Sequence, residues 1–296
     1  MKEILDKLPP KYQKALKQLG KEAAGSLEEI RILEGRQVLF YCGGKEYPSG
    51  IVTEQREVEA VLSAILSYSV YSFQKELSRG YMTLPGGHRV GVCGTVVEEE
   101  TGIKVIKDIS SLNIRRCRQV PKAAEKVIGQ IMPGGAESVR NSLLISPPGC
   151  GKTTLLREII RSLSEGGCRV SVVDERGELG GAFRGRLQMD LGPRTDVLTG
   201  CPKARGMMMM LRTMTPRVLC FDELGGKRDQ EALEEVLYAG VKVITTVHGT
   251  DYEGLLHTPL ERLLRRGIFE RFIVLGRQPS VGTVKQIRDE KGRALL

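Results

Sequence analysis

Short segments in which apolar and polar residues alternate dominate the first 120 positions, and each such segment predicts a strand with one buried face. Residues 27–40 alternate on both sides of Glu34-Gly35, which predicts a hairpin, and residues 81–97 predict two strands around a Pro-Gly-Gly turn. Further elements are predicted as short strands at 103–106 and 112–114, a helix at 1–19 broken by Pro9 and Pro10, and a helix from Glu54 to about Tyr71 with Thr53 as its N-cap. Residues 1–120 are therefore expected to form a small α+β domain.

From residue 121 onward, apolar strands alternate with amphipathic helices. The predicted strands are 143–145, 169–173, 218–221 and 241–247, and the predicted helices are 123–131, 153–163 and 229–239, with a further helix around Met207–Met210. This alternation predicts an α/β domain over residues 121–296, with a largely parallel sheet covered on both faces. Residues 177–201 are rich in Gly and Arg and show no periodicity, so we expect a long functional loop there.

The composition is that of a folded protein and indicates the cell compartment in which the protein acts. The 296 residues carry 45 basic and 36 acidic side chains, a formal charge of +9, and include no Trp. No run of about 18 apolar residues predicts a membrane-spanning helix, and the charged N-terminal segment lacks the apolar centre of a secretory signal. The seven cysteines contain no C-x-x-C pair. We therefore expect a cytoplasmic chain without a disulfide framework or zinc cluster.

The strongest motif is SPPGCGKTT at residues 146–154, between a predicted strand and a predicted helix. It matches the phosphate loop called Walker A, except that Ser146 stands where the usual pattern has its first Gly. Gly149 and Gly151 let successive backbone N–H groups point into one concavity, and Lys152 adds a point charge for the β- and γ-phosphates. We expect Thr153 to contact Mg²⁺, and we expect the nucleotide to be bound by Pro148, Gly149, Cys150, Gly151, Lys152, Thr153 and Thr154.

A second motif, VLCFDE at residues 218–223, is an apolar strand that ends in two carboxylates. In an open α/β sheet this strand end lies beside the phosphate loop, which is the arrangement called Walker B. Asp222 would hold Mg²⁺ through water, and Glu223 would orient and polarise the attacking water. The presence of both motifs in this order predicts ATP hydrolysis and not binding alone.

Two further strand ends carry polar residues. The sequence VVDERGE at 172–178 makes Glu175 and Glu178 candidates for a second water or metal contact, although a structural turn would explain them equally well. Thr246 or His248, in the sequence ITTVHG, could sense the γ-phosphate. The four methionines 207–210 predict adaptable core packing, with a partner-binding face as the alternative.

Long strings beyond these motifs resemble the stage III sporulation protein AA family, the ATPases of the sporulation channel in endospore-forming bacteria. They include EEIRILEGR (28–36), FQKELSRGYMTLPGGHRVGVCG (73–94), ISSLNIRRCR (109–118), VSVVDERGELGG (170–181) and CPKARGMMMMLRTMTP (201–216). The chain is similar, more distantly, to the hexameric ATPases of type II and type IV secretion. The resemblance implies a RecA-like P-loop NTPase core, ATP and Mg²⁺ as ligands, and catalytic roles for Lys152, Glu175, Glu223 and His248.

The same resemblance implies an assembly and a place in the cell. The chain would form a homo-oligomeric ring, with six subunits as the expected number, and would attach to a membrane channel protein on the mother-cell side. An arginine would then act on the nucleotide from outside the phosphate loop, with Arg89, Arg184 and Arg186 as the leading candidates and Arg79 and Arg194 as the others.

Two other functions compete with the ring ATPase. A nucleic-acid-dependent ATPase is permitted by the positive charge, but no array of stacking aromatics accompanies the arginines, so nucleic acid is not the partner we expect. The other competing function is that of a scaffold that binds nucleotide without hydrolysing it.

Overall fold

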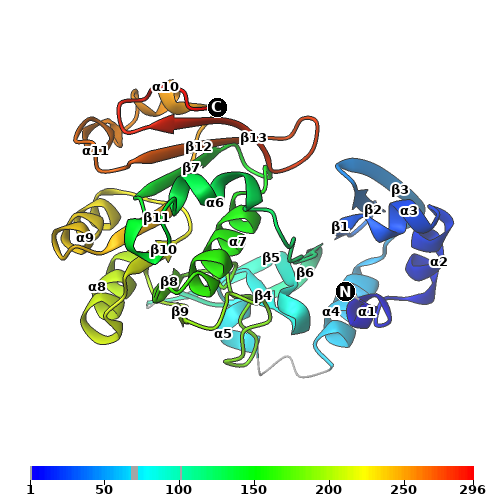
Figure 1. Cartoon of the computed structure of the whole chain (residues 1–296). Coiled ribbons are helices and arrows are strands. Elements are labelled where there is room, and N and C mark those ends of the chain that lie inside the picture. The colour runs from blue at the N-terminus through cyan, green and yellow to red at the C-terminus, as the bar shows by residue number, and fades with distance from the viewer. Residues whose placement is uncertain (1, 68–72, 101) are drawn as a thin grey trace. The chain divides into compact units, whose positions relative to one another are not determined.

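The computed structural model describes residues 2–67, 73–100 and 102–296 (Figure 1). By the contacts among its residues, the chain divides into two compact units, each with its own hydrophobic core. The first unit comprises the residues up to Cys117 together with the segment Phe183–Gln188. The second comprises Arg118–Ala182 and Met189–Leu296. The first unit is therefore discontinuous in sequence.

The first unit is built on a six-stranded antiparallel sheet with the order β3-β2-β1-β6-β5-β4. The strands are β1 Leu27–Leu33, β2 Gln37–Cys42, β3 Lys45–Val52, β4 Tyr81–Thr83, β5 Arg89–Glu99 and β6 Gly102–Arg115. The helices are α1 Lys2–Leu5, α2 Pro10–Gln18, α3 Lys21–Gly25, α4 Gln55–Ile65 and α5 Gln74–Leu77. Alternate side chains of the strands, such as Ile30 and Ile32, join the apolar faces of α2 and α4 in one core. The α+β character predicted for this part of the chain is confirmed.

The predicted N-cap of α4 is wrong. Thr53 is buried, and its hydroxyl shares a 3.0 Å hydrogen bond with the hydroxyl of Tyr12. The N-cap is Glu54 instead, and its backbone N–H donates to the carboxylate of Glu57 at 3.0 Å. The helix ends at Ile65, and residues 68–71 of the predicted helix lie outside the described residues.

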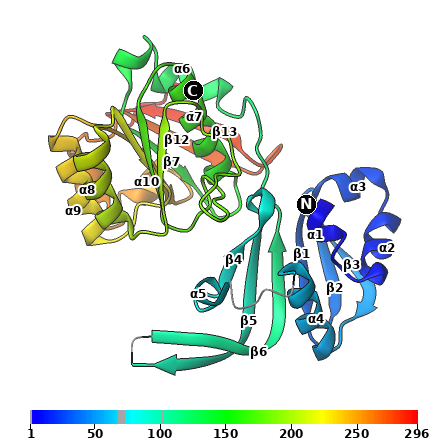
Figure 2. The same ribbon diagram turned by 90° about the horizontal axis from the view of Figure 1, so that it is seen from below.

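The two short strands predicted at 103–106 and 112–114 are parts of one strand, β6, which pairs with β5 along its length (Figure 2). The register of this pair shifts between Cys93 and Thr95. A β-carbon at Gly94 would lie 2.5 Å from the carbonyl oxygen of Lys107, so only glycine allows the two backbones to approach at this bulge. The bulge interrupts the hydrophobic alternation, which is why the sequence pattern suggested two strands.

The second unit contains a seven-stranded sheet with the order β13-β12-β7-β11-β10-β8-β9. Its strands are β7 Ser142–Ser146, β8 Val170–Asp174, β9 Thr195–Thr199, β10 Val218–Phe221, β11 Lys242–His248, β12 Arg271–Gly276 and β13 Thr283–Asp289. Every neighbouring pair is parallel except β12 and β13. The helices are α6 Glu125–Ile131, α7 Lys152–Glu165, α8 Lys203–Met214, α9 Lys227–Tyr238, α10 Tyr252–Leu255 and α11 Glu261–Arg265.

Helices cover both faces of this sheet, and the alternation along the strands decides which face each side chain joins. Leu144 of β7 packs in one core with α6 and α7, whereas its neighbours Leu143 and Ile145 pack in another with α8, α9 and α11. In α8, Met207 and Met210 are buried in that second core, and Met209 is exposed. The predicted α/β fold with a largely parallel sheet is confirmed.

The segment predicted as a loop over residues 177–201 contains a strand that the pattern did not reveal. β9 pairs in parallel with β8 at the edge of the sheet, and its residues are only half-buried or exposed. An edge strand needs no continuous apolar run, so its pattern is weak. The part of the segment before β9 contains no helix or longer strand among its described residues.

Candidate active site

The polar residues identified in the sequence follow four neighbouring parallel strands, β7, β11, β10 and β8. Because the carboxyl ends of parallel strands meet at one edge of a sheet, residues distant in sequence come together there. Ser146 and His248 are direct register partners at the ends of β7 and β11. Asp222 follows β10, and Asp174 ends β8.

The phosphate loop joins β7 to α7 in a conformation that depends on two glycines. Gly149 and Gly151 have φ values of +70° and +83°, in the left-handed region that side chains disfavour. A β-carbon at Gly151 would also lie 3.3 Å from the Cα atom of Gly282. The buried helix α7 begins directly afterwards, so its free backbone N–H groups face the loop. This cradle of backbone N–H groups fits a phosphate chain.

Lys152 is buried at the start of α7, and burial lowers the pKa of its ammonium group. Its Nζ donates to the carbonyl oxygen of Ser146 at 2.8 Å and to Nδ1 of His248 at 2.9 Å. The hydroxyl of Ser146 donates to the carbonyl oxygen of Pro147, so the side chain that replaces the usual Gly is accommodated within the loop. Cys150 is buried, whereas Pro148 is exposed and Thr154 is half-buried.

Thr153 and Asp222 meet between the two motifs. The Thr153 hydroxyl donates to Oδ2 of Asp222 at 2.8 Å. Mg²⁺ prefers oxygen ligands and is commonly bound by one or two protein groups together with substrate phosphates. Within the described residues no group of three or more His, Cys, Asp or Glu side chains is arranged to hold a metal ion. The Thr153–Asp222 pair beside a phosphate cradle therefore fits Mg²⁺ brought in with a nucleotide.

Glu223 has a strained backbone, with φ at +57°. Its carboxylate lies 3.5 Å from Nε2 of His248 and 3.6 Å from Nη1 of Arg176. An ammonium group can only donate, so Nδ1 of His248 accepts from Lys152, and a neutral ring then carries its hydrogen on Nε2, toward Glu223. His248 thus connects the phosphate-loop lysine to the second acidic residue of Walker B.

The acidic segment after β8 combines a structural turn with half-buried carboxylates. The buried carboxylate of Asp174 accepts hydrogen bonds from the backbone N–H groups of Glu178, Leu179 and Gly180 at 2.8, 3.1 and 2.8 Å. Glu175 instead accepts a 2.9 Å hydrogen bond from Nζ of Lys203. A small pocket of about 20 Å³ lies here, lined by Asp174, Glu175, Arg176, Glu178, Lys203, Asp222 and Glu223.

The structure describes the surroundings of the predicted arginines within each unit. Arg89 belongs to the first unit, where its guanidinium stacks 3.7 Å from the centre of the Tyr81 ring. Arg184 and Arg186 also belong to the first unit, within Phe183–Gln188. Arg194 donates to the carbonyl oxygen of Ser164 at 3.1 Å in the second unit. Action of an arginine on nucleotide bound by another subunit stays a prediction.

Two cations near the motifs were missed by sequence reasoning. Lys203 at the start of α8 reaches Glu175, as described above. Arg277, which directly follows β12, has its Nη2 atom 3.5 Å from where a β-carbon of Gly149 would be. The apolar run RFIVLG at 271–276 was an available signal, because a parallel strand beside β7 must place its next residue near the phosphate loop.

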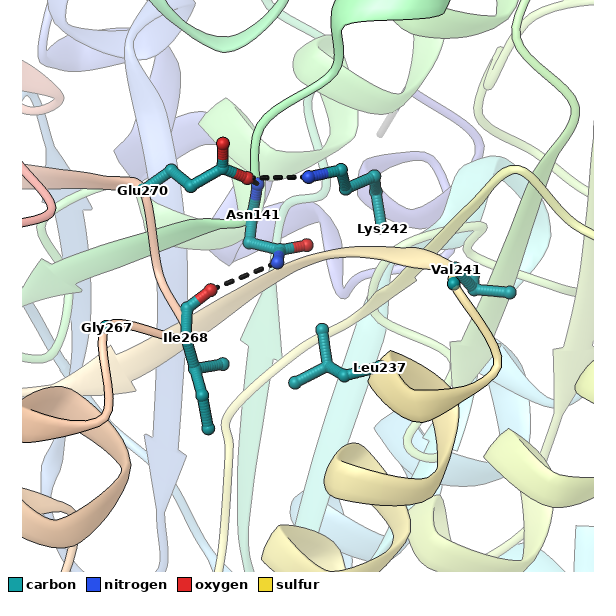
Figure 3. A pocket seen from close by; sticks show the side chains of 8 residues that line it. Asn141, Leu237, Val241, Lys242, Gly267, Ile268 and Glu270 are labelled. Atoms are coloured by element: carbon teal, nitrogen blue, oxygen red, sulfur yellow. Dashed lines mark hydrogen bonds and ion pairs between the residues drawn. The ribbon is translucent and has the colours of Figure 1, made fainter.

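A larger pocket of about 430 Å³ lies at the other end of the same strands, where β7, β11 and β12 begin (Figure 3). Its polar side chains bind one another and the backbone. Asn141 donates to the carbonyl oxygen of Ile268 at 3.0 Å, and Lys242 lies 2.8 Å from the carboxylate of Glu270. Because these polar groups already bind one another and the backbone, the larger pocket is a weaker candidate for an active site than the acidic pocket near the phosphate loop.

The fold and these motifs define a P-loop NTPase core. The structure is similar to that of the ATPase DotB from Legionella pneumophila, with a TM-score of 0.60, 18% identity, and coverage of 90% of this chain and 76% of that chain. It is also similar to the pilus retraction motor PilT, solved with bound ADP, with a TM-score of 0.53, 15% identity, and coverage of 88% and 77%. At these identities the likeness shows the fold.

The chain belongs to the family described as "Sporulation stage III, protein AA", whose model matches residues 1–295. It is 40% identical over 301 residues to Stage III sporulation protein AA of Bacillus subtilis strain 168, covering 100% of this chain and 97% of that protein. Among the described residues, no helix is long and apolar enough to cross a membrane.

Proposed function

We propose that this chain hydrolyses ATP to ADP and phosphate through the site formed by the phosphate loop and the end of β10. The observation that carries the proposal is the 2.8 Å hydrogen bond between Thr153 and Asp222, which joins the two motifs with Glu223 directly beside them. Residues 69 positions apart meet only because two parallel strands end at the same edge of the sheet.

In this proposal the backbone N–H groups of the loop and the ammonium group of Lys152 bind the phosphates. Thr153 and Asp222 would hold Mg²⁺, whose charge offsets that of the phosphate oxygens. Glu223 orients a water molecule and accepts one of its protons as the water oxygen bonds to the γ-phosphorus. The bond to the β–γ bridging oxygen breaks, ADP leaves with that electron pair, and inorganic phosphate forms.

Glu175 and His248 support this reaction from either side. Glu175 lines the same acidic pocket as Glu223 and would make a second contact to water or metal. His248 contacts both Lys152 and Glu223, so a γ-phosphate drawn to Lys152 would also change the environment of the catalytic carboxylate. His248 would in this way report the presence of the γ-phosphate to Glu223.

We further propose that residues 121–296 form the ATPase domain of a homo-oligomeric ring, with six subunits as the expected number. The ring would power or gate a membrane-embedded sporulation channel from the mother-cell cytoplasm, held there by a channel protein. Membership of a sporulation stage III family and a fold shared with DotB and PilT support this assignment. In the ring, Arg89 would act on nucleotide bound by a neighbouring subunit.

The test is phosphate release by the purified chain with ATP and Mg²⁺. We expect Lys152→Ala to lose both ATP binding and turnover. Glu223→Gln should bind ATP like the wild type and turn it over about 100-fold or more slowly, since it loses the proton acceptor. Wild-type turnover in Glu223→Gln would refute the assigned role of Glu223.

Mass in solution, measured with and without ATP, tests the ring. A fully active monomer under every condition would refute ring assembly. Strong stimulation of turnover by single-stranded DNA or RNA, with a steep salt dependence, would replace the channel proposal with a nucleic-acid-dependent ATPase.

A further inference from the structure

The hydroxyl of Thr246 lies between the two acidic residues of Walker B. Thr246 is fully buried in β11, and β11 is the neighbour of β10 in the sheet. Its Oγ1 donates to Oδ1 of Asp222 at 2.5 Å and accepts from the backbone N–H of Glu223 at 2.9 Å. One hydroxyl on the adjacent strand is therefore bonded to both residues that would hold the metal and the water.

Only one arrangement of hydrogens satisfies both bonds. A hydroxyl has a single hydrogen, and the Glu223 N–H must use an oxygen lone pair, so the hydrogen lies toward Asp222. Asp222 then accepts from Thr246 on Oδ1 and from Thr153 on Oδ2. Two hydroxyls from different elements thus fix the orientation of this carboxylate.

Thr246 also holds the strained backbone of Glu223. The left-handed conformation at Glu223 is disfavoured for a residue with a side chain. It is maintained by the bond from Glu223 N–H to the Thr246 hydroxyl and by a 2.7 Å bond from Leu224 N–H to the Thr246 carbonyl oxygen. Loss of the hydroxyl removes the first bond and leaves Glu223 free to adopt an ordinary conformation, which would turn its carboxylate away from His248.

We propose that Thr246 is a positioning residue that sets the orientation of Asp222 and the backbone conformation of Glu223 for catalysis. The inference rests on the proposed ATPase function. Because the hydroxyl is buried and both of its bonds are to the chain itself, Thr246 acts through these two residues and does not contact the γ-phosphate. This assignment separates it from His248, which is exposed.

The chain provides a matched control in the preceding residue. Thr245 is equally buried in the same strand, but its hydroxyl donates to the backbone carbonyl oxygen of Phe221 at 2.8 Å. Thr245→Val and Thr246→Val therefore remove the same atom from the same strand, and only the second affects the acidic residues. Thr246→Ser keeps the hydroxyl, and Thr246→Ala offers a second way to remove it if the valine variant does not fold.

Three readouts test the inference: ATP turnover, ATP binding in EDTA and in Mg²⁺, and the thermal unfolding midpoint. We expect Thr246→Val or Thr246→Ala to lower kcat about 10- to 100-fold, as for a group that acts on the chemical step. Their ATP binding in EDTA should match the wild type, and the gain in affinity on adding Mg²⁺ should be lost. Thr246→Ser should retain most activity and the Mg²⁺ effect, as should Thr245→Val.

Equal kcat and equal Mg²⁺ effects in Thr246→Val and Thr245→Val would overturn the inference, and so would parallel losses in both variants that follow their unfolding midpoints. If the wild type shows no turnover, the proposed hydrolysis fails by itself. The Mg²⁺ effect on binding then still decides the role of Thr246, because that measurement needs no chemistry.

Discussion

The two units differ in the kind of polar group that they bury. Within the described part of the first unit, the buried side chains that carry a polar group are those of Tyr12, Cys42, Thr53, Thr83 and His88, and none of them has a carboxylate, an ammonium or a guanidinium group. The second unit buries charged side chains as well: Lys152, Arg157, Glu158, Asp174, Arg271 and Asp289. Both units have continuous apolar cores, so a difference in core packing does not explain why only the second unit buries charged side chains.

Burying a charge costs several kcal/mol unless it is fully hydrogen-bonded, so a fold bears this cost only where it gains something specific. Arg157 and Asp174 show what is gained. Arg157 donates to the carbonyl oxygens of Glu178 and Leu179, both at 2.8 Å, and Asp174 accepts from the N–H groups of the same two residues. Two buried charges thus hold an irregular backbone segment that lines the acidic pocket.

The largest expected effect follows from removing one of these buried charges. Asp174→Ala should lower the free energy of unfolding by about 3–5 kcal/mol, because three backbone N–H groups lose their acceptor and the buried Arg157 loses a nearby negative charge. Urea unfolding measures this, with Asp196→Ala, an exposed position on β9, as the control expected to stay within about 0.5 kcal/mol. A loss below about 1 kcal/mol in Asp174→Ala would show that this buried charge does not hold the segment after β8 in place.

The first unit should respond to acid through His88. Burial lowers the pKa of His88 from 6.5 to about 4, and its Nδ1 accepts a 3.0 Å hydrogen bond from the backbone N–H of Cys117. Between these two values the unfolded chain binds a proton that the folded chain does not, so stability falls as the pH drops from 6.5 toward 4. Allowing for partial solvent screening, we expect a loss of about 1–2 kcal/mol.

Thermal unfolding at several pH values checks this prediction. His88→Asn, which does not titrate in this range, should remove that part of the pH dependence. If the unfolding midpoint of the variant fell with pH between 6.5 and 4 as steeply as that of the wild type, a group other than His88 would cause the acid sensitivity.

An exposed cation of the second unit should affect ligand binding without affecting stability. Arg277 is exposed and lies against the phosphate loop at Gly149. Arg277→Ala should weaken ATP binding about 5- to 10-fold, the effect of one charge-assisted contact to phosphate. Nucleotide titration measures it, and Lys291→Ala, also exposed in the second unit, serves as the control. Equal affinities of both variants would show that Arg277 does not reach the nucleotide.

The smallest effect is expected for a neutral pair of the first unit. Tyr12→Phe removes one partner of the 3.0 Å bond to Thr53 and should cost about 1 kcal/mol in urea unfolding. Adding Thr53→Val in a double-mutant cycle should show that the two losses are coupled. A cost similar to that of Asp174→Ala would mean that neutral and charged buried groups contribute alike, against the comparison drawn above.

The sequence predicted what local pattern and strand-end geometry determine. The phosphate loop, the parallel sheet and the nearness of Thr153 to Asp222 all follow from motifs on strands that end at one edge. Contacts made by residues that belong to no motif could not be predicted from the sequence, because no local pattern indicates their partners. Lys203 reaches Glu175 only because an unrecognised edge strand, β9, precedes α8.

Thr53 shows the same limit in the first unit. Its sequence position suited an N-cap, but a tertiary partner, Tyr12, takes up its hydroxyl. Thr246 was identified as a polar residue at a strand end, and the distances to Asp222 and Glu223 were needed to separate a positioning role from contact with the phosphate.

The discontinuity of the first unit has a consequence for biosynthesis. Phe183 stacks on Phe73 with ring centres 6.5 Å apart, and the side-chain oxygen of Gln188 accepts a hydrogen bond from the backbone N–H of Gly86 at 2.9 Å. When residue 117 of the nascent chain has emerged from the ribosome, the segment Phe183–Gln188 of this unit has therefore not yet been synthesised. The missing part follows only after the phosphate loop, α7 and β8 have been synthesised. The N-terminal unit is thus completed late in translation, and a nascent chain stopped at residue 117 would lack the ring that packs on Phe73.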